Sequence, residues 1–328
     1  MDLICTSPPY WALRSYTDGG AHYDGQIGSE PTPAAYVDSL IECTRECMRV
    51  LKPAGSLWVN LGDKYSTGAG GGGNLAEMSA ERYAGGGHTS AKARTATKRV
   101  PGMPPKSLIG LPWRYALRCI DDLGLILRAE VIWSKPNGLP ESVTDRVRRS
   151  HEQWFHLTLN PRYYGAVDEI REPYSENKPW GTRTLGRTDA SRGDTGQADK
   201  VIDWRRSENP LGKLPGSVWT IAAEPLTVPD HLGVDHFAAF ATEWPRRIIL
   251  GWSPPGGTVA DPFGGTGTTA LVAEALGRRG ISVDMSADYC RLAKWRTSDR
   301  AQIAKALGVA KPPKETDGQF DLFGEVVA

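Results

Sequence analysis

The sequence lacks any apolar run that approaches the roughly 20 residues needed to span a membrane. Its apolar start is only a few residues long and ends at Pro8-Pro9, so no secretory signal peptide is expected either. The five cysteines are scattered and odd in number, which argues against a disulfide framework and favours a reducing cytosol. We therefore expect a cytoplasmic protein without a membrane partner.

Excess charge is also absent, because the 328 residues carry a formal net charge of only +1. The whole molecule is not a polycation, so any nucleic acid would have to bind a local basic face. The length suits one large α/β domain or two small ones, and the 40% hydrophobic content is enough for a sizeable core.

The sequence also lacks a complete motif for a phosphate-binding loop or for a metal site. The glycine runs Gly70–Gly73 and Gly85–Gly87 are not followed by Gly-Lys-Ser/Thr, which excludes a phosphate-binding P-loop. Cys43 and Cys47 lie one helical turn apart, but no further ligands are spaced for zinc. The run His151–His156 misses the metalloprotease His-Glu-x-x-His spacing by one residue. No metal is therefore expected.

What is present is an alternation of strand-like and helix-like segments, which is typical of an α/β protein. Segments 66–106 and 171–216 interrupt it, because the first is glycine-rich and the second is polar without a clear period. The tail 311–328 has little periodicity. The expected strands are 3–5, 56–61, 125–133, 152–159, 258–260 and 280–283, and the expected helices are 32–50, 108–123, 235–250 and 268–276.

The glycine-rich turn after the strand 258–260 is the first candidate binding feature. In Asp261–Thr269 the chain leaves a strand, turns on glycines and enters a helix, whose free amides suit anionic groups. Asp284 ends the following strand, where an acid suits hydrogen bonds to ribose hydroxyls. The same pattern also fits a purely structural connection between a strand and a helix.

Dinucleotide binding fits this turn less well than a related ligand does. The turn reads Phe-Gly-Gly-Thr-Gly instead of Gly-x-Gly-x-x-Gly, and Asp261 would face a pyrophosphate unfavourably. The same acid would suit a ligand with an ammonium group. S-adenosylmethionine has an ammonium group, a ribose and an adenine, so it is the expected cofactor.

Ser7-Pro8-Pro9-Tyr10, directly after the first expected strand, makes the interpretation specific. It resembles the catalytic motif of the DNA amino-methyltransferases, which modify N4 of cytosine or N6 of adenine, and Asp261–Gly267 resembles their S-adenosylmethionine motif. The catalytic motif comes first and the cofactor motif last, as in the beta class of that family. Other segments that resemble this family are Leu51–Pro53, Asn60–Asp63, Trp133–Asn137, Pro140–Arg146 with His151-Glu152, and Asp235–Phe240.

The resemblance implies a Rossmann-like class I methyltransferase fold of the α/β class. Such a fold has a mostly parallel twisted sheet with helices on both faces, here with a circularly permuted motif order and a small target-recognition lobe. The catalytic half would span 1–170, with a basic insertion at about 66–106, and the recognition region would span 171–216. The S-adenosylmethionine-binding half would be 217–310, followed by the tail. The resemblance also implies a cytoplasmic protein of prokaryotic or phage type.

The residue types of the catalytic motif suit this chemistry. An exocyclic base amine is a poor nucleophile because its lone pair is delocalised into the ring, so hydrogen-bond acceptors must draw its hydrogens. The Ser7 hydroxyl and the Pro8 carbonyl are the expected acceptors, and Pro9 helps to fix the backbone. The Tyr10 ring would stack on an extruded base with help from Trp11, and His151-Glu152 would support the base pocket.

The resemblance also assigns the cofactor contacts. His236 and Phe237 would close over the methionine end of the cofactor, unless they are ordinary core residues of a helix. The remaining expected contacts are Asp261, Pro262, Phe263, Gly264, Gly265, Gly267, Thr268 and Asp284.

Double-stranded DNA is the expected partner. No acidic residue occurs between positions 82 and 120, so this basic segment suits phosphate contacts unless its bias is accidental. Segment 171–216 mixes basic and acidic residues with tryptophans, which suits the reading of base edges in a short recognition sequence. A cognate restriction endonuclease would be a separate chain. The expected DNA contacts are Lys92, Arg94, Lys98 and Arg99 in the first segment and Arg205 and Arg206 in the second.

Position 7 bears on the choice of target base. Ser7 favours cytosine N4, because adenine enzymes more often have Asp or Asn at this position, and adenine N6 stays open. No Pro-Cys pair occurs, as it does in enzymes that methylate cytosine C5, so Cys5 is expected to be a buried strand residue. An RNA or protein amide methyltransferase and a catalytically dead DNA-binding relic are more distant alternatives.

Family members usually carry a segment before the catalytic strand, including a Gly-Asp that helps to hold the adenine of the cofactor. The present sequence starts at the catalytic strand. We therefore expect either that the gene begins earlier or that this element is supplied elsewhere.

Overall fold

The structure is a computed structural model of the 328-residue chain. It describes residues 1–13, 17–18, 21–22, 25–66, 100, 102–138, 140–174, 183–184, 201–202, 209–234 and 241–308.

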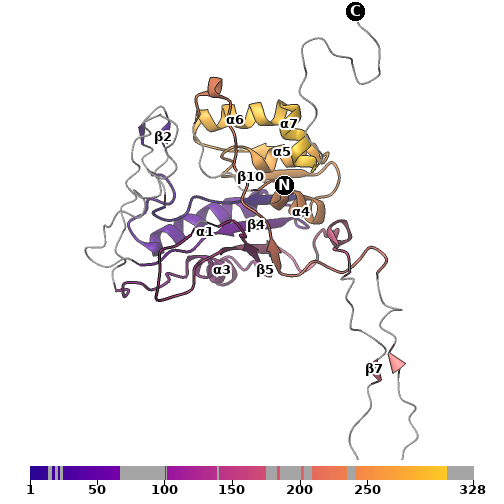
Figure 1. Cartoon of the computed structure of the whole chain (residues 1–328), viewed down its shortest axis with the longest axis horizontal. Coiled ribbons are helices and arrows are strands. Elements are labelled where there is room, and N and C mark those ends of the chain that lie inside the picture. The colour runs from indigo at the N-terminus through magenta and orange to yellow at the C-terminus, as the bar shows by residue number, and fades with distance from the viewer. Residues whose placement is uncertain are drawn as a thin grey trace, which may run out of the picture.

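A seven-stranded sheet with helices packed against it organises these residues (Figure 1). Within the described ranges, no helix is long and apolar enough to cross a membrane. The strands are β1 Leu3–Thr6, β2 Thr17–Asp18, β3 Ala21–His22, β4 Ser56–Leu61, β5 Ile126–Ser134, β6 His151–Thr158, β7 Arg183–Thr184, β8 Val201–Ile202, β9 Val218–Thr220, β10 Thr258–Asp261 and β11 Arg279–Ser282. The α-helices are α1 Pro33–Val50, α3 Leu111–Asp121, α4 Glu243–Trp252, α5 Thr268–Ala275, α6 Ala287–Ser298 and α7 Arg300–Leu307, with 3-10 turns at Val167–Ile170 and Asp230–Leu232.

The order of strands in the sheet is β11-β10-β1-β4-β6-β5-β9. β11, β10, β1 and β4 are parallel neighbours, whereas β6 runs antiparallel between β4 and β5. β9 pairs parallel with β5 at the other edge. The expected mostly parallel α/β sheet is thus confirmed. Because β10 pairs directly with β1, a strand from the end of the chain lies beside the strand at its start.

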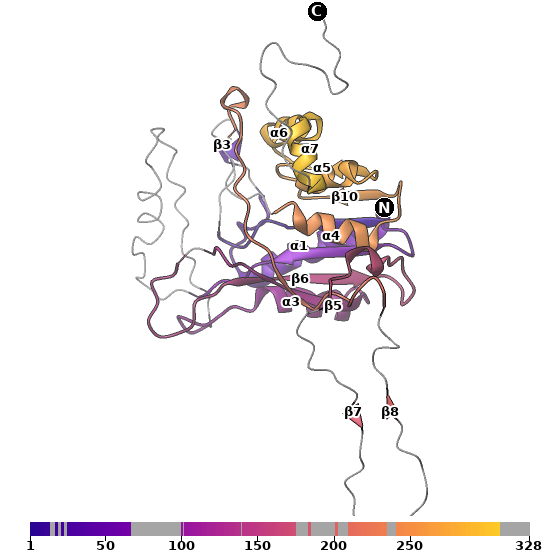
Figure 2. The same cartoon turned by 45° about the vertical axis from the view of Figure 1, so that its right-hand side comes forward.

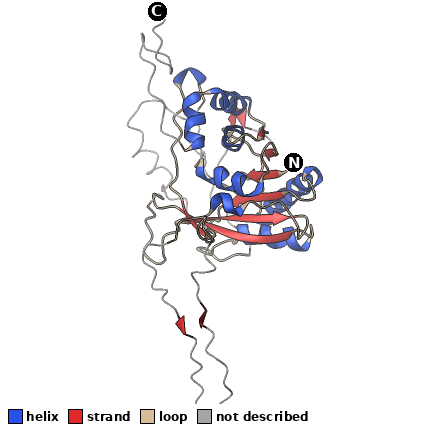
Figure 3. Cartoon of the chain, turned by 90° about the vertical axis from the view of Figure 1, so that its right-hand side faces the viewer, coloured by secondary structure: helices blue, strands red, loops and turns tan. Residues whose placement is uncertain are grey.

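Successive side chains of β1 are buried on opposite faces of the sheet, as expected for a pleated strand. Ile4 lies in a cluster with α1 and α3, whereas Leu3 and Cys5 lie in a second cluster with α4 and α5. Figure 3 shows helices on both sides of the sheet, and Figures 1 and 2 place α5, α6 and α7 together, away from α3. The expected covering of both faces is therefore confirmed.

Two predicted helices have different starts. The helix expected from 235 begins at Glu243, since residues 241 and 242 are not helical and Pro245, which has no N–H to donate, sits in the first turn. The helix expected from 108 begins at Leu111 after Gly110, whose φ of 79° is left-handed. The Asp63 carboxylate accepts hydrogen bonds from the backbone N–H groups of both Gly110 and Leu111, so it caps this helix.

Candidate active site

The two sequence motifs meet at one edge of the sheet. Because β1, β4, β10 and β11 are parallel, the segments that follow them all leave the sheet at its carboxyl edge. The end of β5 and the start of antiparallel β6 reach the same edge. This is the edge at which open α/β sheets bind ligands.

Asp261 connects the two motifs directly. The Thr6 hydroxyl, one residue before Ser7, donates to Asp261 Oδ1 at 2.5 Å. The Thr269 hydroxyl from α5 donates to Asp261 Oδ2 at 2.9 Å, and the Phe263 N–H donates to Oδ1 at 3.0 Å. Asp261 is 1% exposed, and this burial raises the pKa of its carboxyl to about 6. Three protein donors thus surround the carboxylate that the sequence assigned to an ammonium group.

The glycine turn is held in place by a residue that the sequence did not indicate. Arg296 on α6 is 2% exposed, and its guanidinium donates to the Thr266 hydroxyl and the Thr268 hydroxyl, both at 2.7 Å. Burial lowers the pKa of this guanidinium to about 10. Gly267 has a φ of 73°, and a Cβ there would lie 2.5 Å from the Cβ of Ala293 on α6. Only glycine therefore fits between the turn and α6.

Asp284, two residues after the end of β11, supports the same turn. Its Oδ2 accepts from the N–H of Gly265 at 2.8 Å, and its Oδ1 accepts from the N–H of Ser286 at 2.8 Å. The residue is partly exposed. Because a carboxylate oxygen has two lone pairs, each oxygen keeps capacity for a further donor.

The hydrogen-bond direction at Ser7 is defined by Asn60 at the end of β4. The Asn60 Nδ2 donates to the Gln153 carbonyl at 3.0 Å, so its Oδ1 faces the Ser-Pro-Pro-Tyr turn. The Ser7 hydroxyl donates to that Oδ1 at 3.2 Å. With its single hydrogen engaged, the Ser7 oxygen has only acceptor capacity left for another partner.

Tyr10 is anchored through its hydroxyl, which lies 2.7 Å from Asn60 Oδ1 and 2.7 Å from Glu152 Oε2. Glu152 in turn receives the Lys135 ammonium at 2.5 Å. Burial and the neighbouring Glu152 raise the pKa of the phenol well above its ordinary value. The ring packs so closely over Gly62 that a Cβ there would lie 2.5 Å from Tyr10 Cε2. These contacts fix the plane of the ring.

The Pro-Pro turn itself is held by α1, since the Tyr36 hydroxyl donates to the Pro9 carbonyl at 2.8 Å. Trp11 is not available for stacking on a base, which corrects the expectation from the sequence. Its side chain is 1% exposed in the core and donates to the Glu30 carbonyl at 2.9 Å. The expected burial of Cys5 is confirmed, and burial raises the pKa of its thiol well above the ordinary value.

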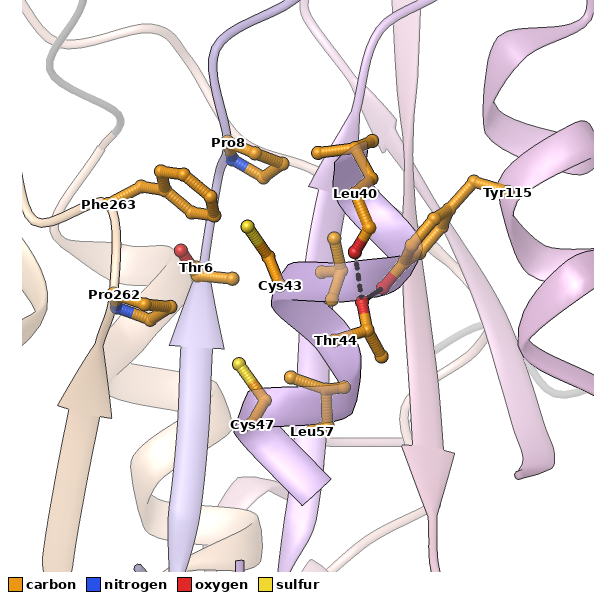
Figure 4. Close-up of a pocket in the computed structure, with 11 residues that line it drawn as sticks. Thr6, Pro8, Leu40, Cys43, Thr44, Cys47, Leu57, Tyr115, Pro262 and Phe263 are labelled. Carbon is orange, nitrogen blue, oxygen red and sulfur yellow. Dashed lines mark hydrogen bonds between the residues drawn. The ribbon is translucent and has the colours of Figure 1, made fainter. Parts of the chain in front are cut away.

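A small cavity lies behind the two motifs (Figure 4). Pro8, Pro262 and Phe263 line it from the motifs, and Cys43 and Cys47 of α1 face it from the other side. Its volume of about 10 Å³ is close to the minimum for one water molecule, so it is too small for a cofactor. No group of three or more potential metal ligands occurs in the described part of the chain.

Several expected site residues lie outside the residues that the structure describes. These are His236 and Phe237, and the expected DNA contacts Lys92, Arg94, Lys98, Arg99, Arg205 and Arg206.

The comparisons with known proteins agree with this arrangement. A family model described as DNA methylase, of the N6 and N4 methyltransferases, matches residues 1–295. The chain belongs to this DNA methylase family. The methylase is 36% identical over 298 residues to the Type II methyltransferase M.SmaI of Serratia marcescens, covering 90% of this chain and 83% of that protein. It is 34% identical over 291 residues to the Type II methyltransferase M.Cfr9I of Citrobacter freundii, covering 88% and 79%.

The fold of the methylase also matches a solved structure. The PvuII DNA methyltransferase (cytosine-N4-specific) superposes with a TM-score of 0.57 at 19% identity, over 93% of this chain and 84% of that chain. The expected class I methyltransferase fold is thereby confirmed.

Proposed function

We propose that this methylase transfers a methyl group from S-adenosylmethionine to N4 of a cytosine that is flipped out of a specific site in duplex DNA. The observation that carries the proposal is the direction of the hydrogen bond at Ser7. When the Ser7 hydroxyl donates to Asn60, its oxygen offers lone pairs that can accept from an incoming amine.

Pro8 supplies the second acceptor. No donor among the described residues is directed at its carbonyl oxygen, whereas the Pro9 carbonyl is occupied by the Tyr36 hydroxyl. Two acceptors that draw the hydrogens of the base amine bring its lone pair out of conjugation. Both oxygens belong to a turn with fixed proline torsions, so little reorganisation is needed during the reaction.

Tyr10 provides the surface on which the flipped base stacks. One side of its ring packs against Gly62, and its hydroxyl is held by Asn60 and Glu152. A ring that is already immobilised loses little entropy when a base stacks on its other face.

When bound, S-adenosylmethionine supplies an electrophilic methyl group on a sulfonium. The residues present suit this ligand, because Asp284 keeps acceptor capacity for the ribose hydroxyls and the turn leads into the amino terminus of α5. The proposed contacts also include Pro262, Phe263, Gly264, Gly265, Gly267, Thr268, His236 and Phe237. Because Asp261 is buried, we assign it the positioning of the turn beside Ser7.

The remaining assignments rest on the sequence. Ser7 favours cytosine N4, and adenine N6 is the alternative. The basic insertion and the recognition region would contact duplex DNA, within the domain limits given above. Relatives named Type II methyltransferases support a separate restriction endonuclease as the partner of the system.

Methyl incorporation from labelled S-adenosylmethionine into DNA, RNA and protein tests the proposal. We expect label in duplex DNA alone, at sites that sequencing of the methylated DNA then identifies. Label in RNA or protein, or no label in any substrate, would contradict it.

Asp284→Ala is expected to weaken S-adenosylmethionine binding by about 1.5–3 kcal/mol, or roughly 10- to 150-fold in Kd, because charged hydrogen bonds to the ribose are lost. Calorimetric titration measures the change. Asp288→Ala, on the neighbouring helix α6 and paired with Arg291, is the matched control. An unchanged dissociation constant for the Asp284 variant would mean that the cofactor binds elsewhere.

Tyr10→Ala is expected to lower kcat/KM for DNA methylation by about 1–3 kcal/mol of lost stacking, roughly 5- to 150-fold. Tyr10→Phe keeps the ring and removes only the hydroxyl, so its effect should be clearly smaller. Steady-state kinetics on one duplex substrate compares the two variants. If both lose the same activity, the hydroxyl and not the ring carries the role of Tyr10.

A further inference from the structure

The loop between β5 and β6, described at residues 135–138 and 140–150, exposes an apolar side chain that the proposed chemistry does not use. Val147 is 86% exposed, more than any other large hydrophobic residue in the described part of the chain. Single exposed apolar residues are common on protein surfaces, so exposure alone assigns no role. The surroundings of Val147 distinguish it.

The loop is braced and not loosely attached. The Lys135 N–H donates to the Ser150 carbonyl at 2.9 Å, which continues the β5–β6 pairing into the base of the loop. The Arg148 guanidinium donates to the Gly138 carbonyl at 3.0 Å and so crosses the loop from one side to the other.

The backbone at Val147 is held by its neighbour. The Arg146 guanidinium donates to the Val147 carbonyl at 3.0 Å and to Glu141 at 2.7 Å, while it stacks 3.9 Å from the centre of the Tyr65 ring. Asp145 pairs with Lys106 at 2.6 Å. Val147 is therefore exposed on a loop whose flanking side chains bond to other loop residues and contact Tyr65 and Lys106.

The loop also has the position to meet DNA. It returns to the sheet at His151-Glu152, and Glu152 holds the Tyr10 hydroxyl, so the loop borders the proposed base pocket. An exposed apolar side chain on a braced loop that ends beside the proposed base pocket suits the vacated step of a duplex.

We propose that Val147 is an apolar wedge that enters the base stack of duplex DNA where the target base has left it. The wedge fills the hole in the stack and so stabilises the flipped state, which offsets part of the cost of unpairing. Val147 would act through the DNA and not on the reacting atoms, so it is a positioning residue. The inference rests on the proposed function, since it requires a base that is flipped from a duplex.

Val147→Ala tests the wedge, with Val218→Ala as the matched control, because Val218 is 60% exposed on β9. Two oligonucleotide duplexes carry the site mapped by sequencing, one fully paired and one with an abasic position opposite the target base. For Val147→Ala we expect kcat/KM to fall about tenfold on the paired duplex and less than about twofold on the abasic one, where no pair must be broken. Val218→Ala should change neither value, and Val147→Leu should restore the rate on the paired duplex.

An unchanged rate of Val147→Ala on the paired duplex would overturn the wedge. Equal losses on both duplexes would also overturn it, because they would indicate a contact that does not depend on base pairing. If the wild-type protein methylates neither duplex, the proposed function itself fails and the wedge falls with it.

Discussion

Ser7→Ala is expected to slow methyl transfer to DNA by about 2–4 kcal/mol of transition-state stabilisation, roughly 30- to 1,000-fold in kcat. The variant removes one of the two acceptors that draw the hydrogens of the base amine, and the Pro8 carbonyl remains. Single-turnover kinetics with saturating cofactor measures the chemical step. Binding of S-adenosylmethionine should stay nearly unchanged, because Ser7 contacts Asn60 and not the glycine turn.

Asn60→Ala is the partner variant to Ser7→Ala. Asn60 orients the Ser7 hydroxyl, so its loss should also slow the chemical step while Ser7 itself is kept. Wild-type turnover in the Ser7 variant would contradict the role of Ser7 as an acceptor.

Asp261→Asn is expected to change the pH dependence of folding stability. The folded state holds the pKa of Asp261 at about 6, against an ordinary value of 3.8, so between these pH values it binds more protons than the unfolded state. The unfolding free energy of the wild type therefore falls as pH rises through this window, by about 3 kcal/mol. The asparagine side chain at position 261 does not titrate, so the variant lacks this pH dependence. Its stability relative to the wild type should rise by about this amount between pH 3 and pH 7.

Asparagine suits this position because its oxygen can still accept from Thr6 and Phe263. Its amide can donate to the Thr269 hydroxyl, whose own hydrogen then turns to the Cys5 carbonyl 3.2 Å away. Urea unfolding at several pH values measures the difference. Asp230→Asn, on an exposed turn, is the control for the loss of a carboxylate. Parallel pH profiles of the wild type and Asp261→Asn would contradict the raised pKa.

The sequence predicted the parts of the site whose residues are contiguous. Ser7–Tyr10 and Asp261–Thr269 each combine a strand end with a turn, so their chemistry can be recognised without the fold. The strands 3–5, 56–61 and 258–260 were predicted almost to the residue, because short apolar runs bounded by proline or glycine favour buried strands.

The sequence placed His151-Glu152 in support of the base pocket, but it could not assign the partners of the individual supporting contacts. Glu152 reaches Tyr10 from 142 positions away, through the pairing of β4 with β6. Asn60 and Lys135 belonged to matching pieces, but their partners depend on that register. The burial of Arg296 could not be predicted, because an arginine on a polar helix is usually exposed. Its role depends on the packing of α6 against the glycine turn.

Elements with weak apolar patterns were missed for the same reason. α6 and α7 are short and polar, and their starts depend on caps from Ser286 and Asp299. β9 has only three residues and pairs along the edge of β5. The early start predicted for α4 came from extending an apolar pattern past Pro245, which the first turn of a helix tolerates but its interior does not.

Mass analysis of nucleosides from duplex DNA, after incubation with the protein and S-adenosylmethionine, tests the central claim most directly. The account predicts N4-methyldeoxycytidine with the wild type and a strongly reduced yield with Ser7→Ala. N6-methyldeoxyadenosine would keep the site but overturn the assignment of the base. Finding 5-methyldeoxycytidine, or no methylated nucleoside, would contradict the claim that the Ser-Pro-Pro-Tyr turn and the glycine turn form an amino-methyltransferase site.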